Sequence, residues 1–269
     1  MLIWPAARLQ PSAATTRSFD GVRRFGEAHH RQRRLITSRT ANKACQNQDL
    51  LDPLTAAMYM PSQFNSDQPH HAADLIRAYP LASVISVDDS GFPFVSHLPL
   101  NLQDQDQPWR LLGHVARGNP HWRYLQARSK ALVTFFGPHA YLTPKIYPDL
   151  TRVPSWNYLA VHCQVETTLI DLPEDKDALL KHLIADHEPG YAAQWRGLDE
   201  GYTQKMLSGI VAFEMQITKL ECKLKLNQHR PESHAKLHAL YASGNDHERA
   251  LADWMSRLGM AEPASDQND

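Results

Sequence analysis

The sequence has few of the features that define several large protein classes. It contains only three cysteines, Cys45, Cys163 and Cys222, which are far apart and form no Cys-x-x-Cys pair. A disulfide framework and a zinc ribbon are therefore not indicated, and we expect a reducing, cytoplasmic setting. No apolar run approaches the length that crosses a bilayer, and the apolar start of the chain ends at Pro5, so we expect neither a membrane segment nor a signal peptide.

Motifs for common nucleotide and metal sites are also missing. The Gly-x-Gly-x-x-Gly and Walker patterns do not occur, which argues against a dinucleotide-binding parallel sheet and a P-loop. The chain has 15 histidines, yet His182 and His187 are five apart on a predicted helix and do not share a face. No Gly-x-Ser-x-Gly motif indicates a catalytic serine. We therefore predict no metal site and assign no catalytic residue.

Charge is unevenly distributed along the chain. Residues 1–57 hold nine Lys or Arg and four Asp or Glu, whereas the remainder holds 19 basic and 25 acidic residues. The first segment is rich in Arg, Ser, Thr and Gln and has little hydrophobic periodicity, which is typical of a disordered basic extension. Binding to nucleic acid and a transit peptide are alternative interpretations. An organised region begins at Met58.

From Met58 onward, strand and helix patterns follow one another. A helix through Ala72 and Ile76 ends at Tyr79, and the turn 88–91 joins two strands as a hairpin. The clearest alternation of apolar and polar residues covers 156–170. The predicted strands cover 81–87, 92–102, 109–115, 131–137, 156–170 and 210–226. Further helices are predicted after Asn119, at 173–187 and 199–208, and in two amphipathic stretches, 232–242 and 246–258.

Six to seven strands with few intervening helices predict a mainly β (α+β) fold, an antiparallel barrel with peripheral helices. The two amphipathic stretches predict a C-terminal helical tail over residues 232–269, after a barrel domain over residues 58–231. Leu251, Trp254 and Met255 fall on one face of the last stretch. We expect this face to dock either on its own barrel or on a second subunit.

Residues 113–122 lead from a predicted strand directly into a helix start. Asn119 followed by Pro120 is a favourable N-cap and first-turn pair. Free N–H groups and the helix dipole favour an anion at such a terminus, and Arg117 would add a charge-assisted contact. The stretch predicts an anion site. An ordinary capped helix with a surface arginine is the alternative.

Two further stretches have the composition of a ligand pocket. The predicted loop 137–144 is dense in rigid and aromatic residues, and residues 153–158 place two aromatic and two small polar side chains where the longest strand begins. Both suit the wall of a pocket for a planar ligand, although well-packed turns explain them equally well. His97 lies on a predicted strand, where a lone histidine is more often structural.

Several motifs, taken in order, resemble the PaiB family, whose members are described as FMN-binding negative transcriptional regulators. Its members belong with the FMN-binding split barrels of the pyridoxamine-phosphate-oxidase type. The resemblance covers Met58 to about Pro231. The motifs that carry it are Met58-Tyr59-Met60-Pro61, His97-Leu98-Pro99, Gly113-His114-Val115-Ala116-Arg117, Asn119-Pro120, Gly137-Pro138-His139-Ala140-Tyr141, Pro154-Ser155-Trp156-Asn157-Tyr158 and Lys225-Leu226-Asn227-Gln228-His229-Arg230-Pro231.

The resemblance implies a homodimer of six-stranded antiparallel split barrels with one FMN in each of two interface clefts. By position, the FMN phosphate would meet His114, Arg117 and Asn119. The ring system would lie near His97, Tyr141, Trp156 and Asn157. The chain departs from the family's usual ending at Cys222, Leu224, Asn227 and His229. The resemblance leaves contacts at those four positions open.

Three functions of different classes remain open. The first is an FMN-binding regulator whose flavin reports redox state to transcription. The second is a flavin-dependent oxidoreductase. The third is a split barrel that binds haem or no cofactor and acts by interaction. DNA as a partner rests on the family resemblance alone, because the organised region is acidic and contains no helix-turn-helix or basic recognition helix.

Overall fold

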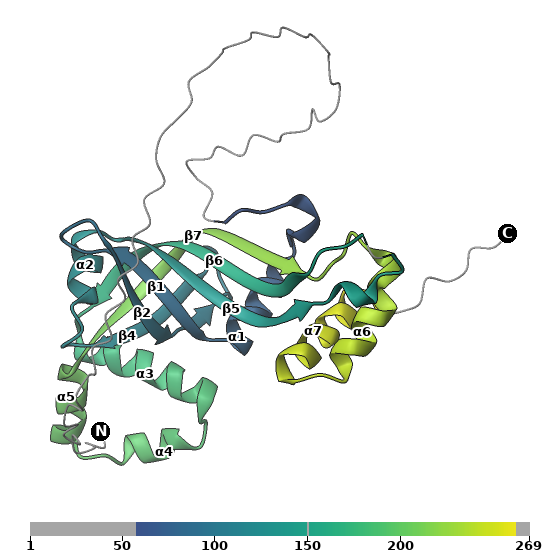
Figure 1. Cartoon of the computed structure of the whole chain (residues 1–269). Helices are drawn as coiled ribbons and strands as arrows, with labels where there is room; N and C mark the ends of the chain where they lie inside the picture. The colour runs from purple at the N-terminus through teal and green to yellow at the C-terminus, as the bar shows by residue number, and fades with distance from the viewer. Residues whose placement is uncertain (1–57, 150, 262–269) are drawn as a thin grey trace, which may run out of the picture. The chain divides into compact units, whose positions relative to one another are not determined.

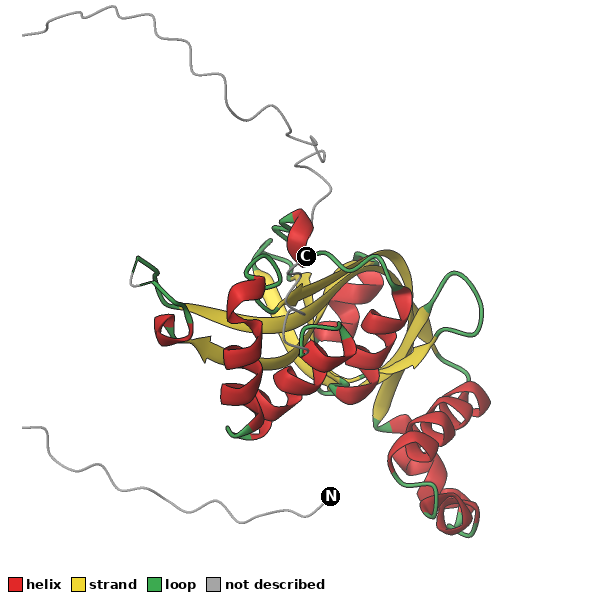
Figure 2. Ribbon diagram, turned by 90° about the vertical axis from the view of Figure 1, so that its right-hand side faces the viewer, coloured by secondary structure: helices red, strands yellow, loops and turns green. Residues whose placement is uncertain are grey.

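The computed structural model describes residues 58–149 and 151–261 of the chain. The basic extension predicted for residues 1–57 and the last residues of the predicted tail lie outside these ranges. Figures 1 and 2 show a curved sheet with helices at its two ends. The strands are β1 (Leu81–Val87), β2 (Pro93–Pro99), β3 (Asn101–Gln103), β4 (Arg110–Ala116), β5 (Lys130–Leu142), β6 (Ser155–Ile170) and β7 (Ile210–Lys225).

Seven α-helices surround the sheet within the described ranges, and most match the pattern in the sequence. The predicted helix 173–187 has the observed bounds, and it begins with proline and acidic residues that suit a helix N-terminus. The six-residue helix α4 was not predicted, because it is too short to show a periodic pattern. The helices are α1 (Pro69–Ala78), α2 (His121–Ala127), α3 (Pro173–His187), α4 (Tyr191–Arg196), α5 (Glu200–Ser208), α6 (His234–Ala242) and α7 (Asp246–Arg257).

The sheet closes on itself through a break in one predicted strand. Its order is β2-β1-β5-β6-β7-β4-β3, and all pairs are antiparallel. The predicted strand 92–102 is in fact two strands, since Leu100 turns into the core and its N–H donates to the carbonyl of Pro80 at 3.0 Å. Consecutive strands β2 and β3 therefore lie at the two opposite edges. The fold class is confirmed, but the sheet has seven strands rather than six.

Strand β5 is longer than predicted. Residues 137–142, expected as part of a loop, continue the strand and pair with β6 after an irregularity between Phe136 and His139. Gly137 lies in this bulge, and a Cβ on it would lie 3.1 Å from Leu75 Cδ2 and 3.3 Å from the carbonyl oxygen of Leu159. Glycine thus permits the bulge to pack closely against Leu75 and β6. The amino-acid composition of the stretch does not indicate this contact.

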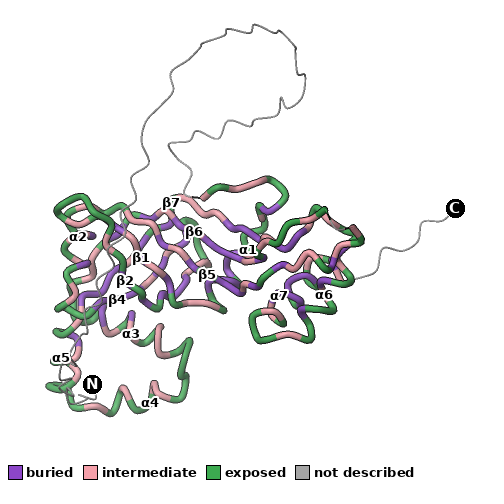
Figure 3. The backbone as a smooth tube through the Cα atoms, viewed as in Figure 1, coloured by how far each residue is buried: buried purple, intermediate pink, exposed green. Residues whose placement is uncertain are grey.

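The core lies inside the curved sheet and under α1. Alternate residues of β5 and β6, such as Val133, Phe135 and Leu159, are almost completely buried, whereas their neighbours point outward. Helix α1 buries Leu75 and Ile76 against this core, each contributing about 1.5–3 kcal/mol. Figure 3 shows buried chain along the middle of the sheet and exposed chain in the outlying helices.

The C-terminal helices pack on this chain's own barrel. Leu251 and Met255 of α7 and Tyr241 of α6 are completely buried in the same core as the strands. The ring of Trp254 meets His71 of α1 edge-on, with centroids 5.5 Å apart. Helix α7 begins with a reciprocal capping box between Asn245 and Glu248. Of the two docking alternatives, the structure shows the intramolecular one.

Helices α3, α4 and α5 form an excursion between β6 and β7 at the end of the barrel opposite α6 and α7 (Figure 1). Asn101 of β3 donates a hydrogen bond to Asp186 of α3, which ties the excursion to the sheet edge. Across 58–149 and 151–261, every helix is too short or too polar to span a membrane.

Candidate functional site

The three residues expected at the FMN phosphate follow one another at the end of β4 but point in different directions. His114 lies on the outward face of β4, and its Nδ1 is buried without a hydrogen-bond partner. Burial holds the pKa of His114 below its usual value. The imidazole is therefore neutral near pH 7, and its Nδ1 is an unsatisfied polar atom.

Arg117 turns toward the end of α5. Its Nε donates to the carbonyl of Ser208 at 2.8 Å and its Nη2 to that of Ile210 at 3.3 Å. Nη1 stays available. The side chain also lines a pocket of about 500 Å3 together with Lys176 of α3, whose side chain is buried. Because two cationic side chains line it, this pocket suits a phosphate better than the other described sites at this end of the barrel.

Asn119 is engaged within the protein. Its Oδ1 accepts the backbone N–H of His121 at 3.0 Å, and its Nδ2 donates to Ser96 Oγ at 3.0 Å. The helix itself starts one residue later than predicted, with Pro120 as the N-cap residue, while the side chain of Asn119 still accepts a backbone N–H of its first turn. Asn119 positions α2 against β2.

His121, which the sequence reasoning did not single out, is the centre of this network. Its ring nitrogens lie 2.9 Å from Ser86 Oγ and 2.8 Å from Ser96 Oγ, and the side chain is completely buried. Burial lowers the pKa of His121 to about 4. The only signal in the sequence was its position directly after Asn119-Pro120.

Residues expected at the flavin ring do form a cluster. Tyr141 of β5 and Trp156 of β6 are cross-strand partners whose rings meet edge-on at 6.1 Å. We call the group to which they belong the aromatic surface. Its members are Phe136, His139, Tyr141, Trp156 and Tyr158, linked by ring centroid distances of 4.9 to 6.2 Å. Phe136, Tyr141 and Trp156 are each about half exposed, so the surface offers aromatic area to a planar ligand.

Asn157 and His97 lie apart from this surface. Asn157 is completely buried, with its Nδ2 donating to the hydroxyl of Tyr241 at 3.1 Å, while its Oδ1 has no hydrogen-bond partner. It lines a separate pocket of about 280 Å3. His97 is exposed on β2 and its Nδ1 lies 3.0 Å from Ser83 Oγ. His97 shares the outward sheet face with Phe136, as the registers of β1, β2 and β5 show.

The two halves of the expected site are at opposite ends of the sheet. Trp156 lies where β6 begins, whereas Arg117 follows the β4 residue that pairs with Ile210 at the start of β7. Ile170, the last residue of β6, pairs close to Ile210. At about 3.3 Å per residue, the strand path from Trp156 to Ile170 is roughly 45 Å. Figure 1 shows these two ends of the sheet apart from each other, with α6 and α7 beside one and α5 beside the other. One chain therefore does not bring its own Arg117 to its own aromatic surface.

Among the comparisons with known proteins, the family model indicates the cofactor. Residues 58–219 match the family model described as "Putative FMN-binding domain". The chain is 30% identical over 181 residues to "Protease synthase and sporulation protein PAI 2" of Bacillus subtilis (strain 168), covering 65% of this chain and 84% of that one. It is 32% identical over 109 residues to the uncharacterized protein YKL070W of Saccharomyces cerevisiae, covering 38% and 63%.

Among solved structures, the FAD and heme binding protein from Mycobacterium smegmatis aligns with a TM-score of 0.50 and 22% identity, over 60% of this chain and 73% of that chain. This likeness concerns the fold. Fold and family model together define an FMN-binding protein of the split-barrel class. The chain belongs to the PaiB family, and FMN is its cofactor.

The described residues fit a flavin in three respects. The aromatic surface is exposed enough to carry an isoalloxazine ring, and the pocket of Arg117 and Lys176 supplies positive charge for a phosphate. The unpartnered Nδ1 of His114 is a polar atom that a ligand would satisfy. When bound, FMN supplies hydride and single-electron chemistry, while the protein binds and orients it.

Proposed function

We propose that the protein works as a split-barrel homodimer with one FMN in each of two interface clefts, and that this dimer is a negative transcriptional regulator of the PaiB kind. The separation of the two half-sites supports the dimer. A ring on the aromatic surface of one protomer would meet a phosphate pocket only if a second protomer supplied it. Two-fold symmetry would then complete two equivalent sites.

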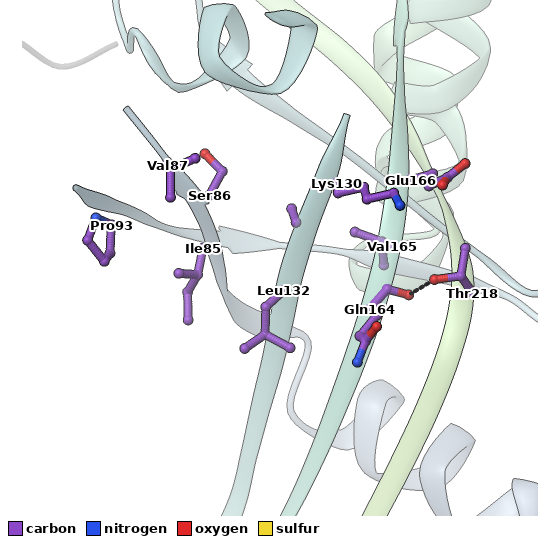
Figure 4. A pocket seen from close by; sticks show the side chains of 11 residues that line it. Ile85, Ser86, Val87, Pro93, Lys130, Leu132, Gln164, Val165, Glu166 and Thr218 are labelled. Atoms are coloured by element: carbon purple, nitrogen blue, oxygen red, sulfur yellow. Dashed lines mark hydrogen bonds between the residues drawn. The ribbon is translucent and has the colours of Figure 1, made fainter. Parts of the chain in front are cut away.

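An outward apolar face favours a second copy as the partner. Val95, Ile85 and Leu132 form one row across β2, β1 and β5. Around this row lies a hollow of about 510 Å3, and Figure 4 shows the side chains of Ile85 and Leu132 within it. Val87 and Phe92 are also exposed nearby. Contiguous apolar surface of this kind is typical of interfaces, and an isologous contact would cover it on both protomers.

The test is the mass of the full-length protein in solution together with its FMN stoichiometry. Val95→Glu places a charge on the proposed interface, whereas Leu240→Glu places one on the exposed side of α6, which does not line the hollow. We expect the wild-type protein and Leu240→Glu to be dimers with one FMN per chain. Val95→Glu is expected to be monomeric, with FMN affinity reduced at least tenfold. A monomeric variant that keeps full FMN affinity would contradict the interface site.

The regulatory role is tested separately with DNA. A promoter fragment is expected to shift at physiological salt, to be released by specific competitor only, and to bind differently when FMN is reduced. The acidic composition of the chain beyond residue 57 predicts little non-specific attraction to DNA from this region. DNA binding that is lost at moderate salt and does not depend on the DNA sequence would instead reflect the basic residues 1–57. Such binding would count against a specific regulator.

A flavin-dependent oxidoreductase is the second candidate. It is favoured by the pocket of about 280 Å3 that Asn157 and Lys225 line, because Lys225 Nζ lies 5.6 Å from the ring centre of Tyr158, a member of the aromatic surface. A small substrate would have a place to bind near a flavin on that surface. Reduction of bound FMN by NAD(P)H with turnover on an acceptor would support the enzyme. Reduction without turnover on any acceptor would favour the regulator.

A further inference from the structure

We propose that the pocket lined by Asn157 binds a small phosphate- or carboxylate-bearing molecule that is distinct from FMN. The pocket lies between the β5–β6 connection and the exit of β7, at the barrel end opposite Arg117, and has a volume of about 280 Å3. We call it the basic pocket. Its size suits one small metabolite anion.

Positive side chains converge on the basic pocket. Arg152, Lys225 and Arg230 all line it. Arg152 is paired with Asp149 at 2.9 Å and lies 4.0 Å from Glu232. No carboxylate in the described ranges forms an ion pair with Lys225 or Arg230. The pocket therefore keeps uncompensated positive charge, which an anion would neutralise.

The pKa of His229, which also lines the pocket, is affected by this positive charge. Burial is the largest cause that lowers its pKa, and the positive charges of Arg230 and Lys225 lower it further, whereas Glu232 acts in the opposite direction. His229 is accordingly neutral near pH 7. It offers a hydrogen bond without adding to the charge.

Two buried polar atoms in the lining, Arg152 Nε and Asn157 Oδ1, have no hydrogen-bond partner. Arg152 Nε is buried and makes no hydrogen bond. The amide of Asn157 is completely buried and makes one hydrogen bond, to Tyr241. If the amide were turned over, the Tyr241 hydroxyl would donate to Oδ1 in place of the carbonyl of Tyr141, and Nδ2 would face no partner. One amide atom is therefore unsatisfied in either orientation. In the second orientation, Asn157 offers an N–H to an anion.

Hydrogen bonds within the protein hold the pocket in shape. Asn227 adopts a left-handed φ of 70°, a conformation that asparagine tolerates better than most residues. Its Oδ1 accepts from the Tyr147 hydroxyl at 3.0 Å, and its Nδ2 donates to Ser233 Oγ at 2.9 Å. These bonds fix the turn that carries His229 and Arg230 toward β6. Such preorganisation lowers the entropic cost of binding.

The experiment is calorimetric titration of the FMN-saturated full-length protein with inorganic phosphate and with acetate. Wild-type protein is expected to bind at least one of the two probes. Arg230→Gln and Lys225→Gln are each expected to weaken that binding about tenfold, as for loss of one charge-assisted contact. Arg230→Lys, which keeps the charge, is expected to retain most of it. Lys236→Gln removes an exposed charge from α6 and serves as the matched control.

FMN and riboflavin affinities of the same variants identify the source of the anion. Unchanged affinity for both supports a second, separate ligand. If Arg230→Gln weakens FMN binding tenfold but leaves riboflavin binding intact, the pocket holds the phosphate of the cofactor and the proposal is wrong. Absence of phosphate and acetate binding to the wild-type protein, or equal binding by all variants, overturns it as well. Melting temperatures establish that each variant is folded.

Discussion

His121 is expected to make the stability of the protein depend on pH between about 6.5 and 4. The imidazole lies completely buried between Ser86 and Ser96, and burial lowers its pKa from 6.5 to about 4. Above pH 6.5 the ring is neutral in both the folded and the unfolded chain, so it contributes no pH dependence. Below pH 6.5 the unfolded chain binds a proton at this histidine that the folded chain does not bind, so the free energy of unfolding falls.

The magnitude follows from the width of this window. At about 1.4 kcal/mol per pH unit, the interval from 6.5 to 4 corresponds to a loss of about 3 kcal/mol in the free energy of unfolding. That is a large part of the 5–15 kcal/mol typical of a folded domain. Below pH 4 both states are protonated and this contribution stays constant.

His121→Gln is the matched variant, because an amide also offers one donor and one acceptor to the two serines but does not titrate. The assay is urea unfolding of both proteins from pH 7.5 to pH 4, at fixed protein and FMN concentrations because ligand and dimer linkage shift apparent stability. All other titrating groups are common to both proteins. The stability difference between them is expected to change by about 3 kcal/mol over the window. A difference that stays constant with pH would refute the reasoning.

Three further predictions concern the cofactor and the core. Arg117→Ala is expected to weaken FMN binding more than tenfold in a fluorescence titration, since a charge-assisted contact is worth about 1.5–3 kcal/mol; unchanged affinity would rule out the phosphate assignment. Gly137→Ala is expected to cost about 1–3 kcal/mol in urea unfolding through the close contacts of its new Cβ, while Gly118→Ala, with open space around it, is expected to cost nothing comparable; equal effects would count against the bulge argument. Leu251→Ala is expected to cost about 2–5 kcal/mol and Leu240→Ala, which is partly exposed, much less, if the tail shares the barrel core.

Most of the secondary structure could be predicted from the sequence, because local patterns of apolar and polar residues determine it. The alternation over residues 156–170 predicted β6, and the apolar stripe with its leading proline predicted α3 with its observed bounds. The linked motifs also carried the family and its cofactor, which the comparisons confirm. Short elements such as α4 gave no signal, because six residues do not complete two helical turns.

Long-range contacts, in contrast, determine how these elements pair and which groups their polar side chains face. The break at Leu100 depends on its contacts with the core and with Pro80, and the extension of β5 depends on pairing with β6; neither partner is local in sequence. The stretch 113–122 looked like one anion site, yet its side chains diverge toward α5 and β2. The basic pocket is lined by both Asn157 and Arg230, two residues that are far apart in the sequence. Long-range hydrogen bonds and packing set these distances, and local propensity carries no information about them.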